Sequence, residues 1–78
     1  MYVYILQSLL NPSKRYIGST HNLKKRLQEH NRGKAIFTNK YKPWKLVVAI
    51  WFENNEKAFA FEKYLKNGSG YAFAKKHF

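Results

Sequence analysis

The sequence predicts a small α+β domain in which helices pack against an antiparallel sheet. Residues 2–6, YVYIL, alternate between two faces as a strand does, and residues 45–52, KLVVAIWF, form the β-branched and aromatic run typical of a buried strand. Residues 22–33 and 55–68 instead repeat apolar side chains at helical spacing. Because 78 residues provide one hydrophobic core, we expect a single domain over residues 1–78.

The first half of the chain predicts a hairpin followed by a helix. The turn residues at 11–14 join the first strand to a returning strand at 15–19. Asn22 is expected to cap the first helix, and Gly33 is expected to end it. Residues 34–44 show no clean period and are expected to form a long basic loop before the third strand.

The second half adds helices and completes the order β-β-α-β-α-α. Asn55 is expected to cap the second helix, and Gly68 is expected to end it. The tail, residues 69–78, can add a short third helix. On the second helix an apolar stripe is expected to face the sheet, formed by Ala58, Phe61 and Leu65.

Positive charge gathers in the middle of the chain. Between Lys14 and Lys45 ten Lys and Arg residues stand against Glu29 alone, which accounts for +9 of the net charge of +11. Such a field attracts polyanions, so we expect a nucleic-acid partner. The alternatives are a ribosome-associated surface or one that only keeps the protein in solution.

Several classes of protein are excluded by composition. The chain has no cysteine, so disulfide scaffolds and thiolate zinc sites are ruled out. No stretch approaches the length of a membrane span. The first ten residues lack a basic start and are interrupted by Gln7 and Ser8, which argues against a signal peptide. We therefore expect a cytoplasmic protein with no membrane partner.

Acidic residues are scarce, and one has a distinctive place. There is no Asp, and the chain has four glutamates. A two-metal site needs several convergent acids, so at most one divalent ion can be held here. Glu62 lies beside the apolar stripe of its helix, within about 40° of Ala58 on the helical wheel. It is either the metal ligand or a glutamate at the edge of the core, paired with a lysine.

On the first helix, Arg26 and His30 are four residues apart and share a face. A guanidinium there can clamp a phosphate with two hydrogen bonds, and the imidazole can add a donor or relay a proton. The alternative is that both belong to the polar side of an ordinary amphipathic helix.

The chain also has two tyrosines in short motifs, Tyr4 in YVY and Tyr16 in YIG. Together with Arg26, His30 and Glu62, these tyrosines resemble the GIY-YIG nuclease domain. The resemblance covers essentially the whole chain and is greatest to the short stand-alone members related to the N-terminal nuclease module of the DNA-repair excinuclease. Tyr2 and Val3 replace the family's Gly and Ile, a change that affects packing more than chemistry. The matching residues are Tyr4 of YVY, Tyr16 of YIG, Arg26 and His30 of NLKKRLQEH, and Glu62 of FEKYLK.

The resemblance implies a central three-stranded antiparallel sheet and hydrolysis of DNA phosphodiester bonds with one divalent ion, Mg²⁺ or Mn²⁺, on Glu62. Either Tyr4 or Tyr16 would be the general base, with neighbouring cations favouring its phenolate. Arg26 would stabilise charge in the transition state, and His30 would orient the water or the phosphate. Cleavage directed by DNA structure or by weak sequence preference would serve DNA repair, recombination or processing.

The partner implied is the DNA phosphate backbone, and the short chain leaves room for a targeting protein partner. The aromatic residues Phe37, Tyr41 and Trp44 either stack on unpaired bases or anchor their loop to the core. Two other functions stay open: a non-catalytic nucleic-acid-binding module using the same basic groove, and an assembly protein docking on RNA. The residues expected to track the phosphate backbone are Lys14, Lys24, Lys25, Lys40 and Lys42.

Overall fold

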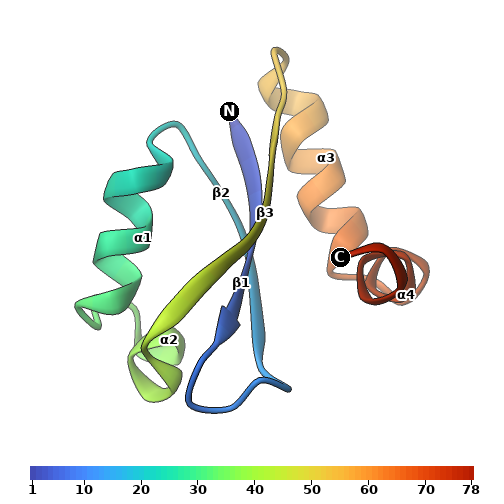
Figure 1. The fold of residues 1–78 in the computed structure, drawn as a ribbon. Coiled ribbons are helices and arrows are strands. Elements are labelled where there is room, and N and C mark those ends of the chain that lie inside the picture. Colours follow the sequence, from blue (N-terminus) through green and yellow to red (C-terminus); the bar gives the residue numbers. More distant parts are fainter.

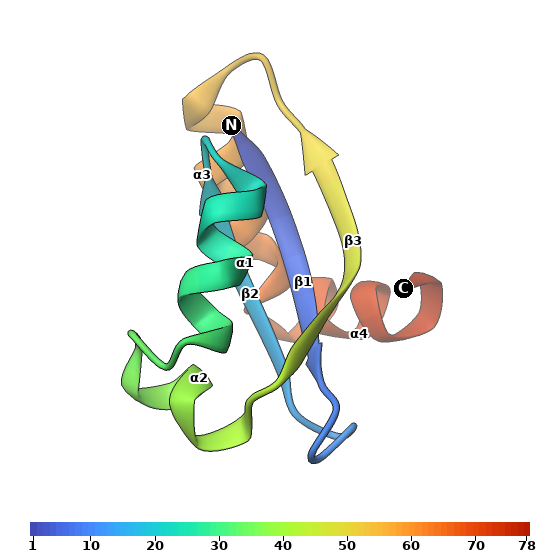
Figure 2. The same cartoon turned by 60° about the vertical axis from the view of Figure 1, so that its left-hand side comes forward.

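Three antiparallel strands form the centre of the molecule in a computed structural model that describes residues 1–78 (Figures 1 and 2). The strand order is β2-β1-β3. The strands are β1 (Tyr2–Ser8), β2 (Arg15–Thr20) and β3 (Trp44–Trp51). One face of the sheet is covered by α1 (Leu23–Asn31) and α2 (Ile36–Tyr41). The other is covered by α3 (Asn55–Leu65) and α4 (Gly68–His77).

The central strand β1 is buried on both faces because its alternating side chains enter two different cores. The aliphatic core, on the side of α3 and α4, consists of Met1, Val3, Ile5, Ala58, Leu65 and Ala74. The aromatic core, on the side of α1 and α2, consists of Tyr4, Leu6 and Trp44, with Leu23 and Leu27 of α1 packed against it. The predicted α+β class and the apolar stripe of α3 are therefore confirmed.

The helix caps confirm two expectations and correct a third. The Asn22 side chain accepts a 3.0 Å hydrogen bond from the N–H of the third residue of α1, and Gly33 follows that helix with φ of 80°. At α3 the cap is Asn54 rather than Asn55, with the equivalent bond also 3.0 Å long. Both asparagines suit an N-cap, so cap preference did not decide between them.

The segment expected to be a long loop contains the short helix α2. Six residues are too few to display a helical period, and contacts with the rest of the protein hold them in place. Thr38 is buried, and the indole Nε1 of Trp44 donates a 2.7 Å hydrogen bond to its carbonyl oxygen. Trp44 therefore anchors this segment to the core, which was one of the two roles considered for it.

The C-terminal segment also departs from expectation at one point. The helix α3 ends at Leu65, and Gly68 begins α4 instead of ending α3. The tail is a helix of 10 residues that crosses the end of α3 (Figure 1). None of the four helices combines the length and apolar character needed to cross a bilayer.

Candidate active site

Two tyrosine rings lie together on the face of the sheet that α1 and α2 cover. Tyr4 of β1 is the cross-strand partner of Gly18, and Tyr16 precedes Gly18 by two residues, so both tyrosines share this face. Their ring centroids are 6.3 Å apart. A Cβ atom on Gly18 would lie 2.6 Å from the Tyr4 hydroxyl oxygen, so glycine is required for the ring to occupy this place.

His30 connects Tyr4 to α2 through a buried chain of hydrogen bonds. Its Nε2 is 2.9 Å from the Tyr4 hydroxyl, and its Nδ1 is 3.0 Å from the Thr38 hydroxyl. Thr38 donates its own proton to the carbonyl oxygen of Ala35 at 3.3 Å and can therefore only accept from the ring. These three contacts are all satisfied when a neutral His30 carries its proton on Nδ1 and accepts the Tyr4 proton on Nε2.

The surroundings keep both members of this pair uncharged. Burial, reinforced by the charge of Arg26, lowers the pKa of His30 to about 4. Burial also raises the pKa of Tyr4 to about 12, although Arg26 pulls it in the opposite direction. The expectation that neighbouring cations favour a phenolate is therefore wrong in its net effect for Tyr4, because desolvation outweighs them.

Arg26 lies one turn before His30 on α1, and its guanidinium is partly exposed. It forms a 3.2 Å ion pair with Glu29, three residues on. Burial opposes the charged form, but the interaction with Glu29 and those with the Tyr4 and Tyr16 hydroxyls raise the pKa of Arg26 above its usual value. The guanidinium is therefore held as a permanent cation beside the two tyrosines.

Glu62 approaches from the opposite side of the sheet, around the edge strand β2. Its Oε1 accepts a 2.7 Å hydrogen bond from the Ser19 hydroxyl, and its Oε2 accepts one of 2.8 Å from the Lys66 ammonium. The carboxylate is also close enough to Tyr4 for its charge to raise the tyrosine pKa. Glu62 thus has the lysine partner expected of a structural residue, and its charge also acts on Tyr4.

No group of three or more His, Cys, Asp or Glu side chains is arranged to hold a metal ion. This agrees with the scarcity of acids in the sequence. A single carboxylate still suits Mg²⁺, which keeps several waters and is commonly bound by one or two carboxylates together with substrate phosphates. Glu62 fits that pattern, provided that phosphate and water complete the ion's ligands.

The remaining predicted residues surround this cluster. Lys24 and Lys25 lie exposed on α1, and Lys40 and Lys42 lie exposed at the end of α2. Lys14 is only half exposed, and its ammonium lies 5.5 Å from the centroid of the Tyr41 ring. Of the three aromatic residues in the basic segment, Trp44 is buried and Tyr41 half-buried, while Phe37 is 44% exposed and lies beside Tyr16.

Three residues join the site that the sequence patterns did not single out. Glu29 stands three residues after Arg26 on a helix, and this spacing could have predicted the ion pair. Ser19 follows Gly18 on β2, so strand alternation could have placed it on the Glu62 side of the sheet. Thr38 gave no signal, because its segment has no periodicity.

Residues 1–75 match the GIY-YIG catalytic domain family. The structure-specific endonuclease subunit SLX1 of Podospora anserina is 41% identical to the chain, in a match covering 83% of this chain and 20% of that relative. The SLX1 homolog of Giardia intestinalis is 35% identical, covering 78% of this chain and 18% of the relative.

A short relative covers the domain more completely. UPF0213 protein CPE1444 of Clostridium perfringens is 42% identical, in a match covering 83% of this chain and 69% of that protein. The chain therefore spans about a fifth of the SLX1 relatives and more than two thirds of the short one. No solved structure matches the sequence. The family match over nearly all 78 residues, with the site geometry described above, shows that the chain belongs to the GIY-YIG family.

Proposed function

We propose that this chain is a divalent-metal-dependent endonuclease that hydrolyses DNA phosphodiester bonds, directed by DNA structure or by weak sequence preference. The observation that carries the proposal is the 2.9 Å contact between the Tyr4 hydroxyl and Nε2 of the buried His30. A module that only binds DNA needs no such proton acceptor under a tyrosine. The family and the endonuclease subunits among the relatives support the same class of reaction.

The proton path begins at the water that attacks phosphorus. As this water loses a proton to the Tyr4 oxygen, the Tyr4 proton passes to His30 Nε2. Because the pKa of Tyr4 is about 12, a free phenolate is scarce at neutral pH, and the acceptor nitrogen makes the transfer feasible. The negative charge of a bound phosphate favours the imidazolium that forms, which supports the Tyr4–His30 pair as the general base.

Arg26 and Glu62 would stabilise the negative charge that develops on the phosphate during cleavage. The partly exposed Arg26 guanidinium can donate two parallel hydrogen bonds to the phosphate oxygens, on which negative charge grows as water attacks. Glu62 is the residue that would hold a Mg²⁺ or Mn²⁺ ion, with Ser19 orienting one carboxylate oxygen. Such an ion supplies charge neutralisation at the phosphate and at the leaving oxygen.

DNA is the substrate that the surface favours. Positive charge extends from the site along the helices of this face, where it can contact successive phosphates. It comes from Lys24 and Lys25 of α1, Lys40 of α2 and Lys42 just after α2. An activity of this kind belongs to DNA repair, recombination or processing.

The decisive experiment compares Glu62→Gln with the wild-type protein on a panel of labelled DNA structures in Mg²⁺, Mn²⁺ or EDTA. The substitution keeps the size of the side chain and removes its charge, so cleavage should vanish while the protein stays folded. DNA binding should hold or tighten, since a negative charge facing phosphate is lost. Glu53→Gln, an exposed carboxylate in the loop before α3, is the matched control and should cleave normally.

Each alternative function gives a different result. Metal-dependent cleavage by Glu62→Gln at the wild-type rate would contradict the metal-ligand assignment. A wild-type protein that binds every DNA structure and cleaves none would be a binding module. Preference for RNA together with indifference to Mg²⁺ would indicate an assembly protein.

A further inference from the structure

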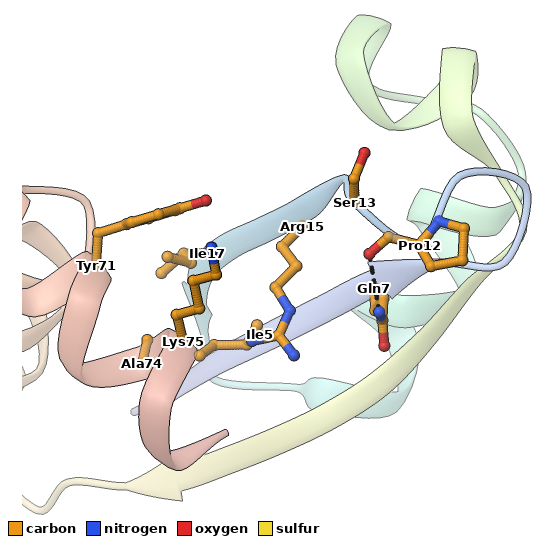
Figure 3. A pocket seen from close by; sticks show the side chains of 9 residues that line it. All are labelled: Ile5, Gln7, Pro12, Ser13, Arg15, Ile17, Tyr71, Ala74 and Lys75. Atoms are coloured by element: carbon orange, nitrogen blue, oxygen red, sulfur yellow. Dashed lines mark hydrogen bonds between the residues drawn. The ribbon is translucent and has the colours of Figure 1, made fainter.

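Two hollows adjoin at the edge strand β2 and have three lining side chains in common, two from β2 itself and one from α4. The first, of about 400 Å³, lies between the hairpin and α4, with Ile5, Ile17 and Ala74 at its apolar base (Figure 3). The second, of about 360 Å³, lies on the outer side of β2 and includes Tyr16, Phe37 and Lys66. Arg15, Ile17 and Tyr71 line both, so together they make one groove, here called the β2 groove.

We propose that the β2 groove receives an unpaired DNA strand that adjoins the scissile phosphate. This inference rests on the proposed endonuclease function and specifies its substrate as DNA in which a single-stranded arm meets the cleavage point. Tyr16 connects the groove to the candidate active site. Its ring centroid lies 4.7 Å from that of His30, and the same ring forms a wall of the groove. Lys66 connects the groove to the proposed metal ligand, since its ammonium pairs with Glu62 and its side chain lines the groove.

The aromatic side chains of the groove suit exposed base faces. Tyr71 is 56% exposed and extends from α4 toward β2 (Figure 3). Its neighbour Phe73 instead packs against Tyr64, with ring centroids 6.3 Å apart. Phe37 flanks the groove on the opposite face of the sheet. An unpaired base can stack on such rings, whereas the bases of a duplex are already stacked on each other.

The charges of the groove suit the sugar-phosphate backbone. Arg15, Lys66 and Lys75 line it, and of these three only Lys66 forms an ion pair with a carboxylate, that of Glu62. Arg15 donates one hydrogen bond of 2.9 Å to the main-chain oxygen of Phe78, which leaves most of its five N–H groups free for phosphate. A peptide pairing with the open edge of β2 is the competing occupant. These cations, together with the three aromatic side chains Tyr16, Phe37 and Tyr71, favour the nucleic acid.

The test measures DNA affinity in EDTA, where no metal-dependent cleavage occurs, for a forked DNA with one unpaired arm and for a plain duplex of equal length. Tyr71→Ala should weaken binding to the fork about tenfold, the equivalent of one base stack. It should change duplex binding less than about twofold. Tyr71→Phe should restore fork binding because it keeps the ring. Trp51→Ala is the control, since Trp51 is a 59% exposed aromatic on β3, the opposite edge of the sheet.

A spectroscopic measurement reports the contact directly. With 2-aminopurine at the first unpaired position of the arm, its fluorescence should be quenched by the wild-type protein and by Tyr71→Phe, but not by Tyr71→Ala. Thermal unfolding verifies that each variant is folded. Unchanged fork affinity in Tyr71→Ala, or equal losses on fork and duplex, would overturn the groove assignment and make a peptide the better candidate. Because these measurements need no cleavage, that result would leave the Glu62 test of endonuclease activity unaffected.

Discussion

The two faces of the sheet differ in the polarity of their buried side chains, although the same strand, β1, supplies side chains to both. Val3 and Ile5 of β1 enter the aliphatic core, where no hydrogen-bonding side chain is buried. Tyr4, the residue between them, enters the opposite face and joins His30 and Thr38 in a buried polar chain. Strand alternation therefore places the aliphatic core on one face and Tyr4 with its hydrogen-bond partners on the other. Substitutions confined to one face at a time can test this division.

Truncating the aliphatic core should affect stability alone. Leu65→Ala removes a buried side chain 1% exposed and should lower the free energy of unfolding by about 2–5 kcal/mol. Ile5→Val, a gentler change on the same face, should cost about 0.5–1.5 kcal/mol. Denaturant unfolding measures both values, and cleavage is assayed well below the melting temperature. A folded Ile5→Val protein that had lost cleavage would show that the faces are not separable.

Acidification should instead destabilise the protein through the polar face. The pKa of His30 is about 4 in the folded protein against an ordinary 6.5, so between these values the unfolded chain binds more protons. The free energy of unfolding should therefore fall, by on the order of 3 kcal/mol, as the pH falls through this window. Arg26 lowers the pKa of Glu29, which adds a loss in the same direction at still lower pH.

Denaturant unfolding at a series of pH values gives this dependence. In His30→Gln the slope between pH 6.5 and about 4 should largely disappear, because the group whose pKa differs most between the folded and unfolded chain in this range is gone. His21→Gln, which removes an exposed histidine before α1, should retain the wild-type slope. An unchanged slope in His30→Gln would mean that His30 is not the group responsible.

Arg26→Lys should separate binding from cleavage on the polar face. Lysine keeps the charge but cannot reproduce the planar two-pronged contact, so cleavage should fall by roughly a hundredfold or more. Affinity for DNA should stay close to wild type because the net charge is unchanged. Single-turnover cleavage and binding in EDTA measure the two quantities. Wild-type turnover would remove Arg26 from the active site.

Thr38→Val should have the smallest effect, because Thr38 acts only through His30. Without the Thr38 hydroxyl, His30 Nδ1 has no hydrogen-bond acceptor, and its proton is no longer held on that nitrogen. Cleavage should fall roughly fivefold, as expected for one hydrogen bond of about 1 kcal/mol, and Thr38→Ser should restore it. Nitrogen NMR of His30 should show the Nδ1-protonated form in the wild type and in Thr38→Ser, and a mixture in Thr38→Val. One tautomer in all three would refute this role.

Residues with a regular spacing could be predicted from the sequence, and those without one could not. Strand alternation located β1, and helical spacing put Arg26 and His30 on one face of α1. Thr38 escaped prediction because α2 is one short helix whose place depends on Trp44 and on His30. The choice between Asn54 and Asn55 could not be predicted, because two adjacent asparagines are equally good N-caps.

The raised pKa of Tyr4 shows a different limit of sequence reasoning. The surrounding cations were visible in the sequence, but the burial of the hydroxyl depends on how three elements meet. Desolvation and charge act on Tyr4 in opposite directions, and only the folded protein shows that desolvation is larger. For Glu62 the sequence likewise left two roles, metal ligand and structural partner of a lysine. The surroundings of its carboxylate, which reaches the edge of β2, depend on how α3 packs against the sheet.

Gly18 has no functional group, yet its lack of a side chain determines where the Tyr4 hydroxyl lies. Even the methyl group of alanine would lie 2.6 Å from that oxygen and push the ring away from His30. In a saturation-mutagenesis map scored by activity, position 18 should therefore be as intolerant as the positions that carry the reacting groups. A search of such a map for catalytic residues would find a bare glycine among them, and the space that it leaves is part of the mechanism.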